Sequence, residues 1–317
     1  MVKERRQTTN NFYICFMTTI PYLQPGDVVY ITAPAKAIEQ EHVLFAKDLL
    51  EKNGFNVKVS KHCLGQHNYF SGTDSERQAD FQEGMDDPEV KAILCARGGY
   101  GCVRIVDQLN WAGMLRQPKW IIGFSDITVF HHRMQQFNLP SIHGSMVLNF
   151  KDNSPEALST LFSALKGTLK EITTPASTHN KFGTCRGKLI GGNLSIVYSL
   201  LGTNDALDFT DSILFIEDLA EHLYHIDRMI FSLEKAGALN KIKGLIVGGM
   251  TDLEDTTIPF GSSVEELLLR PFEYRKIPIA FDFPAGHITD NRALVLGANY
   301  ELSVSENETV LTKIDSI

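Results

Sequence analysis

The chain has 317 residues, of which 43% are hydrophobic and 21% are charged, and its formal net charge is −8. This length is enough for two domains of ordinary size, and the composition is that of a globular protein rather than of a disordered chain. The negative charge balance argues against a nucleic-acid partner, because phosphate backbones are bound by clustered lysine and arginine.

Two further classes are disfavoured by the sequence. No stretch approaches the roughly 20 apolar residues that a membrane-spanning helix needs, so no membrane association is expected. The five cysteines form no Cys-x-x-Cys pair, which supports neither a disulfide framework nor a structural zinc site. Reduced cysteines fit a cytoplasmic protein. Residues 1–16 are expected to be a disordered extension, either frayed or preceding a natural start at Met17.

Strand-like and helix-like stretches alternate over residues 17–150. Buried apolar runs predict strands at Asp27–Thr32, Val57–Val59, Ala92–Cys95 and Trp120–Gly123. Helical spacing predicts helices at residues 38–52, 75–85, 103–109 and 126–137. This alternation predicts an α/β domain with a parallel, doubly wound sheet.

Residues 151–183 differ in character and are predicted to link two domains. A helix is expected from Ser154, as its N-cap, to Lys166, followed by a connector at Thr173–Asn180. Residues 184–317 are predicted to form a second, mixed α/β domain with an antiparallel tail. Its expected elements are a helix ending at Leu201 and strands at residues 213–216, 244–248, 278–281, 300–304 and 309–312.

The run from Trp120 to Ser125 is an apolar strand that stops at a Gly-x-Ser turn, and a helix is expected directly after it. This layout is typical of a nucleophile elbow, which exposes a serine at the end of a strand. The free N–H groups at the start of the helix suit a developing oxyanion. The alternative is that Ser125 or Asp126 only caps the helix.

A glycine-rich loop, Arg97-Gly-Gly-Tyr-Gly101, follows another predicted strand. Its three glycines allow the backbone to approach a ligand closely and to donate N–H groups to an oxyanion or a carboxylate. A phosphate-binding loop is not indicated, because neither a Gly-Lys-Ser/Thr ending nor Gly-x-Gly-x-x-Gly spacing is present. The alternative is a tight turn without a ligand.

A serine nucleophile needs a base and an acid that orients the base, and two strand-end residues are candidates. His287 lies in a loop after the predicted strand 278–281, and Glu217 ends the predicted strand 213–216. Loops at strand ends are where α/β proteins place catalytic groups. The alternatives are an ordinary loop histidine and a carboxylate held in a structural ion pair.

Three other histidines are candidates for a role. His143 ends an apolar stretch and is expected near the site. His222 and His225 follow Asp218 at a spacing that suggests metal binding, but no third ligand stands at a familiar spacing. No metal site is therefore expected.

The separate motifs together resemble one known family. They are Arg97-Gly-Gly-Tyr-Gly, Gly123-Phe-Ser-Asp-Ile-Thr, Gly191-Gly-Asn-Leu, Phe215-Ile-Glu-Asp, Tyr224-His-Ile-Asp-Arg and Gly286-His. In this order they resemble the L,D-carboxypeptidases, the family of muramoyltetrapeptide carboxypeptidase and of the microcin C self-immunity hydrolases. The sequence departs from the family at His143-Gly-Ser-Met146, where the family often has His-Gly-Pro-Met, and at His222 and His225.

The resemblance implies a catalytic triad of Ser125, His287 and Glu217 in the roles of nucleophile, general base and orienting acid. It also implies an oxyanion hole formed by the backbone N–H groups of Asp126 and Gly99.

Residues near the triad are expected to contact the substrate. Arg97 and Tyr100 lie in the glycine-rich loop that the resemblance places at the site. The free carboxylate of the leaving residue needs a cation or a nest of N–H groups, and Arg97 and Arg292 are candidates, each with a structural ion pair as its alternative.

For the fold, the resemblance implies a Rossmann-like N-terminal domain that carries the serine and a smaller C-terminal α/β domain that carries the acid and the base. The site is expected in the groove between them. The implied substrate is a small murein stem peptide, no cofactor is needed, and a homodimer is a further expectation.

The resulting interpretation is a cytoplasmic serine carboxypeptidase that removes the terminal D-alanine from murein tetrapeptides during peptidoglycan recycling. One alternative is a hydrolase of peptidyl or aminoacyl sulfamoyl-adenylates on the same machinery. In that branch an aromatic on a longer loop stacks on the base, whereas residues 151–183 contain no tryptophan. A second alternative is a protein that binds peptidoglycan fragments without catalysis.

Overall fold

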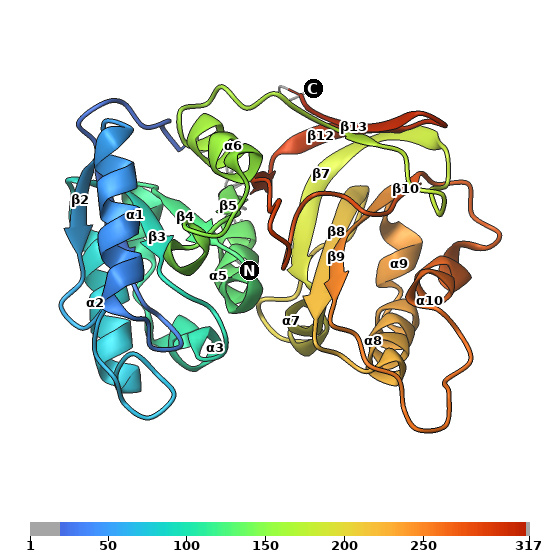
Figure 1. Cartoon of the computed structure of the whole chain (residues 1–317), viewed down its shortest axis with the longest axis horizontal. Coiled ribbons are helices and arrows are strands. Elements are labelled where there is room, and N and C mark those ends of the chain that lie inside the picture. Colours follow the sequence, from blue (N-terminus) through green and yellow to red (C-terminus); the bar gives the residue numbers. More distant parts are fainter. Residues whose placement is uncertain (1–19, 315–317) are drawn as a thin grey trace, which may run out of the picture.

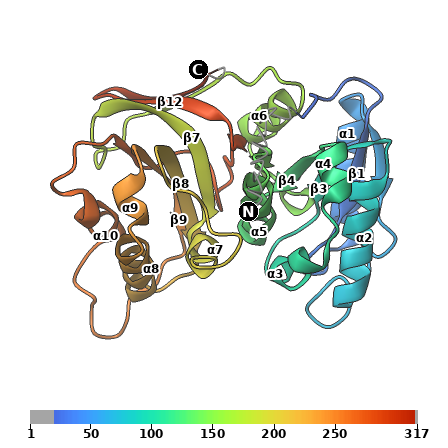
Figure 2. The same cartoon turned by 180° about the vertical axis from the view of Figure 1, so that it is seen from behind.

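Two lobes lie side by side, each built around its own β-sheet (Figure 1). The computed structural model describes residues 20–314, so the extension expected at residues 1–16 lies outside the described residues. The first lobe holds most of the N-terminal half of the chain and the second lobe most of the C-terminal half. The same division is seen from behind (Figure 2).

The first sheet has the strand order β11-β5-β4-β3-β1-β2. Its strands are β1 (Val28–Thr32), β2 (Asn56–Val59), β3 (Val90–Cys95), β4 (Trp120–Gly123), β5 (Ser141–His143) and β11 (Leu294–Leu296). Strands β1 to β5 are parallel and β11 is antiparallel to β5. Because neighbouring parallel strands end at one edge, the loops after β3 and β4 lie next to each other.

The helices of the first lobe follow their strands as expected for a doubly wound sheet. They are α1 (Gln40–Lys52), α2 (Asp74–Asp86), α3 (Cys102–Ile105), α4 (Ala112–Arg116), α5 (Thr128–Gln136) and α6 (Pro155–Leu165). Short 3-10 turns stand at Val106–Gln108, Ser125–Ile127 and Val147–Asn149. Ser154 caps α6 by accepting a hydrogen bond from the Ala157 N–H at 3.0 Å, as the sequence predicts.

The second sheet has the strand order β10-β9-β8-β7-β12-β13-β6. Its strands are β6 (Glu171–Pro175), β7 (Gly183–Asn193), β8 (Ser212–Leu219), β9 (Gly244–Thr251), β10 (Ile279–Ala280), β12 (Asn299–Val304) and β13 (Glu308–Lys313). Strands β7 to β10 are parallel, and β12, β13 and β6 add an antiparallel extension. The accompanying helices are α7 (Leu194–Ser199), α8 (Leu223–Lys235), α9 (Ala238–Lys241) and α10 (Val264–Leu269), with a 3-10 turn at Arg270–Phe272.

The predicted fold class is confirmed, since a parallel first sheet is joined to a second, mixed α/β unit. One local prediction is wrong. Thr173–Pro175, expected within a connector, belongs to β6, whose alternate residues are buried and which pairs with β13. The run of polar residues concealed this edge strand because only one of its faces meets the core. The boundaries proposed at residues 150 and 184 stay predictions.

Several elements were not predicted from the sequence, among them β5, β11 and α8. Strands β5 and β11 are only three residues long, too short for a periodic signal. Helix α8 follows β8, and the sequence interpretation considered only its histidines as metal ligands. Its helical spacing is nevertheless present, because its apolar side buries Ile226, Met229, Ile230 and Leu233.

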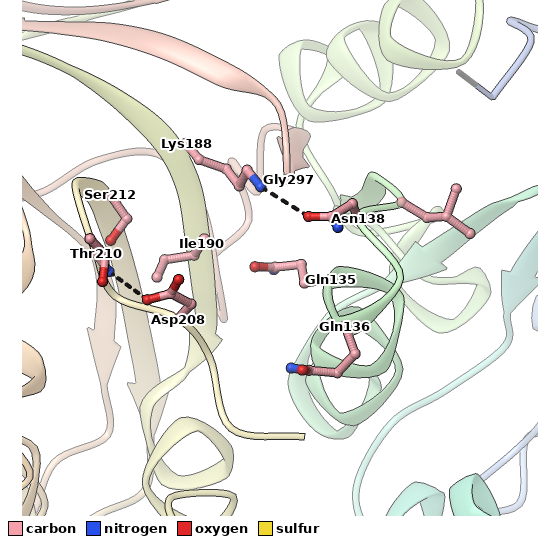
Figure 3. Close-up of a pocket in the computed structure, with 10 residues that line it drawn as sticks. Gln135, Gln136, Asn138, Lys188, Ile190, Asp208, Thr210, Ser212 and Gly297 are labelled. Carbon is pink, nitrogen blue, oxygen red and sulfur yellow. Dashed lines mark hydrogen bonds between the residues drawn. The ribbon is translucent and has the colours of Figure 1, made fainter. Parts of the chain in front are cut away.

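Polar side chains line part of the seam between the lobes (Figure 3). Gln135 and Asn138, at the end of α5, face Lys188 on β7 across a cavity of about 140 Å³. The Lys188 ammonium donates to the Asn138 side-chain oxygen at 3.4 Å. Deeper in the seam, the Arg133 guanidinium on α5 pairs with Asp205. The seam is therefore fixed by directional polar contacts.

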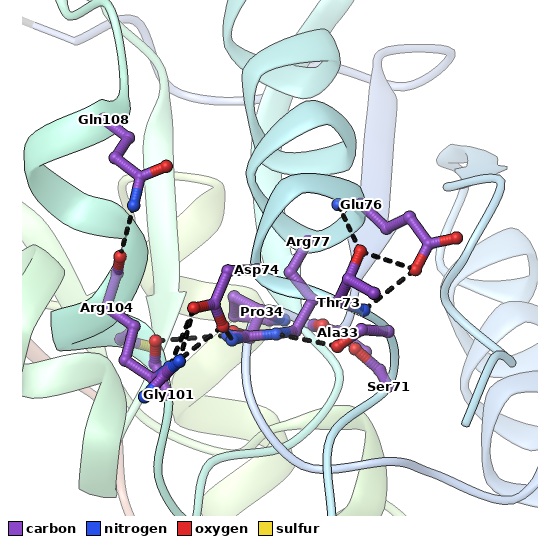
Figure 4. A network of polar contacts seen from close by, with 12 residues as sticks. Ala33, Pro34, Ser71, Thr73, Asp74, Glu76, Arg77, Gly101, Arg104 and Gln108 are labelled. Carbon is purple, nitrogen blue, oxygen red and sulfur yellow. Dashed lines mark hydrogen bonds and ion pairs between the residues drawn. The ribbon is translucent and has the colours of Figure 1, made fainter. Parts of the chain in front are cut away.

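A buried arginine organises the loops at the carboxyl edge of the first sheet (Figure 4). The Arg77 side chain on α2 is 1% exposed and donates to the Pro34 carbonyl and, at 3.1 Å, to the Gly101 carbonyl. It also pairs with Asp74, which the more exposed Arg104 contacts from the other side. Because Gly101 ends the glycine-rich loop, Arg77 fixes that loop to the loop after β1.

We expect Arg77→Leu to lower the free energy of unfolding of the first lobe by about 3 kcal/mol, since it leaves buried carbonyl oxygens without a donor. Arg104→Leu removes the other partner of Asp74 and should cost less than about 1 kcal/mol, because this side chain is partly exposed. Urea unfolding followed by tryptophan fluorescence measures both, since Trp111 and Trp120 lie in this lobe. Equal losses in the two variants would contradict the anchoring role of Arg77.

Candidate active site

Ser125 occupies a strained turn directly after β4. Its φ is 61°, a left-handed value that residues other than glycine rarely adopt. A 3-10 turn begins at this residue and leads into α5. Such strain collects at functional positions, and a strained serine between a strand and a helix is the geometry of a nucleophile elbow.

The glycine-rich loop after β3 touches this serine. A Cβ atom placed on Gly98 would lie 3.1 Å from the Ser125 Cβ and 3.4 Å from the Asp126 nitrogen. Only a glycine allows this approach without displacing the serine. The next residue, Gly99, has a φ of 108° and faces Tyr69 and Lys36. The loop thus lies beside Ser125 as expected, while the donor role predicted for Gly99 stays a prediction.

The side chain of Asp126 joins the two loops. It is 2% exposed, and its Oδ2 accepts a hydrogen bond from the Cys102 N–H at 2.8 Å. Burial raises the pKa of this carboxyl group, although the bond from Cys102 opposes the shift. Because Cys102 follows the glycine-rich loop, the Asp126 side chain helps to hold that loop against Ser125.

Glu217 and His287 form a close pair in the second lobe. The distance from His287 Nδ1 to Glu217 Oε2 is 2.6 Å, and the His287 backbone N–H donates to the same oxygen at 3.2 Å. The glutamate side chain is 0% exposed and the histidine side chain 15%. The carboxylate therefore fixes the Nδ1 tautomer, which leaves Nε2 as the basic nitrogen of the neutral ring.

Local backbone geometry brings these two residues together. Glu217 lies on β8 where the pairing with β9 is irregular between Ile216 and Asp218. Gly286, with a φ of 108°, packs so tightly on Glu217 that an added Cβ would lie 2.7 Å from its side chain. Only a glycine before His287 lets its loop come this close.

Electrostatics around the pair favour a protonated imidazole. Burial lowers the pKa of His287, but the charge of Glu217, its hydrogen bond and the charge of Asp218 together outweigh burial and leave the pKa raised. Burial and the neighbouring Glu217 raise the pKa of Asp218 to about 7. Asn193 Nδ2 and the Ser195 N–H, both 2.9 Å away, hold the Asp218 carboxylate in place.

Phe124 connects the serine turn to the histidine. Its ring centroid lies 4.8 Å from that of His287 in an edge-on arrangement, and 5.8 Å from that of His143. Within residues 20–314 the Ser125 hydroxyl makes no hydrogen bond to His287. The structure thus brings the residue next to Ser125 against the imidazole, and the complete triad stays a prediction. His143 is fully buried near the site.

An open cavity of about 590 Å³ adjoins the imidazole. It is lined by Phe124, Asn149, Asp152, Asn153, Leu219, Thr251, Asp252, His287, Ile288 and Thr289. Asp152 and Asp252 were not singled out from the sequence, because neither follows a recognisable motif. Their proximity to His287 depends on how β9 and the turn after β5 meet across the seam.

The residues predicted to contact the substrate, Arg97, Tyr100 and Arg292, do not line the cavity beside His287. Arg97 donates to the Ala37 carbonyl at 3.1 Å and lines a separate cavity with Lys36 and Tyr69. Tyr100 is 47% exposed at the loop surface. Arg292 pairs with Asp290 at 3.0 Å, the structural ion pair given as its alternative.

The histidines after Asp218 form ion pairs with glutamates. Across residues 20–314, no group of three or more histidine, cysteine, aspartate or glutamate side chains is arranged to hold a metal ion. Instead, His225 Nδ1 lies 2.8 Å from Glu221 Oε2, and His222 lies 3.8 Å from Glu254. In the same range, no helix has the length and apolar character needed to cross a bilayer.

A strained serine at a strand end and a buried acid–imidazole pair define a hydrolase of the serine class. Family models narrow this class. The LD-carboxypeptidase N-terminal domain matches residues 29–144 and the LD-carboxypeptidase C-terminal domain matches residues 186–302. The chain belongs to the LD-carboxypeptidase family and is a serine-type carboxypeptidase, which confirms the resemblance noted in the sequence.

Individual relatives cover nearly the whole chain. A Bacillus subtilis protein described as "Probable murein peptide carboxypeptidase" is 33% identical over 91% of this chain and 92% of its own length. The crystal structure of muramoyltetrapeptide carboxypeptidase from Oxalobacter formigenes superposes with a TM-score of 0.81 at 27% identity, over 91% and 99% of the two chains. The microcin C7 self immunity protein MccF shares the fold, with a TM-score of 0.82 at 20% identity over 93% and 98% of the chains.

We expect NMR titration to give His287 a pKa above its usual 6.5 and Glu217→Gln to lower it below 6.5, because burial is then opposed only by the smaller effect of the Asp218 charge. The raised pKa means that the ion pair stabilises the fold fully below pH 6.5 and that this stabilisation is lost as pH rises through the raised value. Glu221→Gln, which disrupts the separate pair with His225, is the control and should leave His287 unchanged. An unchanged His287 pKa in Glu217→Gln would contradict the coupling.

Proposed function

We propose that this protein removes the C-terminal D-alanine from murein tetrapeptides, cleaving the amide that joins D-alanine to the L-centre of a diamino acid. The observation that carries the proposal is the 2.6 Å pair of Glu217 and His287, whose ring packs on the residue next to Ser125. The family membership supports the reaction class, and the names of the relatives support a murein peptide as substrate. A cytoplasmic role in peptidoglycan recycling is part of this proposal.

In the proposed mechanism, His287 Nε2 takes the proton of the Ser125 hydroxyl as its oxygen attacks the scissile carbonyl. Glu217 stabilises the imidazolium that forms. Backbone N–H groups of Asp126 and of the glycine-rich loop stabilise the oxyanion. The imidazolium then gives its proton to the D-alanine nitrogen, and the C–N bond breaks to leave an acyl-serine. Water, deprotonated by His287, hydrolyses that ester and regenerates Ser125.

The free carboxylate of the leaving D-alanine requires a cation nearby. Arg97 is the residue that we assign to it, because it adjoins the loop that touches Ser125 and has no carboxylate partner within the described residues. Arg292 is less suitable, since Asp290 already neutralises it. Among residues 20–314, Arg97 donates only to the Ala37 carbonyl, which leaves most of its donors for a ligand.

We expect Ser125→Ala to reduce release of D-alanine from a tetrapeptide by roughly 10⁴-fold or more while the protein stays folded, since no nucleophile remains. Ser199→Ala, an exposed serine on α7, is the control and should retain full activity. D-Alanine is measured by a coupled oxidase assay. Near-normal turnover by Ser125→Ala would remove Ser125 as nucleophile, and preferential cleavage of an aminoacyl sulfamoyl-adenylate by the wild type would favour that alternative substrate.

We expect Arg97→Gln to raise KM for the tetrapeptide about tenfold with a smaller change in kcat, because a ground-state contact to the carboxylate is lost. A substrate that ends in D-alaninamide lacks that carboxylate and should show little difference between wild type and variant. Equal effects on the acid and the amide would contradict the assignment of Arg97.

A further inference from the structure

We propose that the cavity beside His287 selects substrates whose diamino-acid side chain carries a net positive charge, with Asp152 and Asp252 as the residues that determine this specificity. The inference rests on the proposed function and concerns the same site. It predicts a preference for stems that contain lysine over stems that contain meso-diaminopimelate with a free distal carboxylate.

The cavity beside His287 lies where the diamino-acid side chain of a bound stem is expected. The cavity of about 590 Å³ is open and is lined by both the His287 and the Phe124 side chains. A peptide held at Ser125 has its scissile carbonyl next to these residues, and the diamino acid is the residue that supplies this carbonyl. Its side chain therefore begins at the mouth of the cavity.

The cavity wall presents hydrogen-bond acceptors that have no donor among residues 20–314. The carboxylates of Asp152 and Asp252 have no hydrogen-bond or ion-pair partner in the part of the chain that the structure describes. The side-chain oxygen of Asn149 is likewise buried without a donor in that part of the chain. Two lining donors are already used, since Thr251 donates to the His287 carbonyl and Asn153 to Ser145. The wall thus offers acceptors to a ligand that donates, as an ammonium group does.

The cavity beside His287 and the cavity beside Arg97 carry charges of opposite sign. Apart from His287, Asp152 and Asp252 are the only ionisable side chains among the described residues that line the cavity. A separate cavity of about 270 Å³, at the start of the glycine-rich loop, has Lys36, Arg97 and one carboxylate, Glu39, among its lining residues. The cavity beside His287 is therefore negative, and the cavity beside Arg97 is positive. A lysine-containing stem that ends in D-alanine carries the complementary charges.

The lysine and meso-diaminopimelate stems differ by one unit of charge at the end of the diamino-acid side chain. A lysine side chain ends in an ammonium group with a charge of +1, whereas the distal end of meso-diaminopimelate carries an ammonium and a carboxylate and is neutral overall. One unit of charge facing two carboxylates in a partly solvated cavity changes binding by about tenfold. Amidation of the distal carboxylate restores the charge of +1 at nearly constant size, so it separates charge from shape.

The test compares kcat/KM for three tetrapeptides that differ only in the diamino acid: lysine, meso-diaminopimelate and its distal amide. The wild type should cleave the lysine and amide stems about tenfold better than the acid stem. Asp152→Asn and Asp252→Asn should each reduce this ratio, and the double variant should bring it close to one, mainly through KM. Glu254→Gln, an exposed glutamate outside the cavity, is the control and should keep the ratio.

Three results would overturn the inference: an equal or reversed preference in the wild type, a preference that survives in the double variant, and a preference for lysine that the amide stem does not share. High salt should also weaken the preference, because it screens these exposed charges.

Binding separates this inference from the proposed function. Calorimetry with Ser125→Ala and the same three peptides reports charge selection without any turnover. Absence of D-alanine release from every stem by the wild type would refute the proposed function, while the order of the affinities would still support or overturn the charge selection.

Discussion

The buried carboxylate of Glu217 is the constraint on which the site depends. A charge that is 0% exposed is stable only if donors reach it, and the ring and the backbone of His287 both donate to its Oε2. This requirement explains Gly286, since any larger residue would push the loop away from the carboxylate. It also explains why the imidazole can hold a proton despite its burial. The acid, the base and the loop therefore form one unit that belongs entirely to the second lobe.

The first lobe contacts the Glu217–His287 unit through a chain of buried hydrogen bonds. The Thr128 hydroxyl, at the start of α5, accepts a hydrogen bond from the Asn193 N–H at 3.1 Å, and Asn193 in turn binds Asp218, the neighbour of Glu217. Gly192 packs on Thr128 so closely that a Cβ would lie 2.6 Å from its hydroxyl. The serine turn and the acid–base pair are thus connected by a short, buried path across the seam, which restricts how far the lobes can separate.

Much of this could be predicted from the sequence, because strands such as β3 and β4 are continuous apolar runs and the motifs stand at their ends. The pairing of Glu217 with His287 was also predicted, but through resemblance rather than through spacing. The strand β5 and the cavity acids Asp152 and Asp252 could not be predicted. These elements are placed by contacts between segments far apart in the chain, and local sequence periodicity does not report such contacts. The homodimer stays a prediction.

Strand β11 also has a consequence for the order of synthesis. Its pairing of Leu294 with His143 completes the edge of the first sheet with residues from near the C-terminus. While the chain is made on the ribosome, β5 must therefore keep an open edge until almost the whole second lobe has emerged. The first lobe alone would expose this edge to pairing with other chains. The finished molecule closes this edge with β11, so the first lobe reaches its final form only after most of the second lobe has been made.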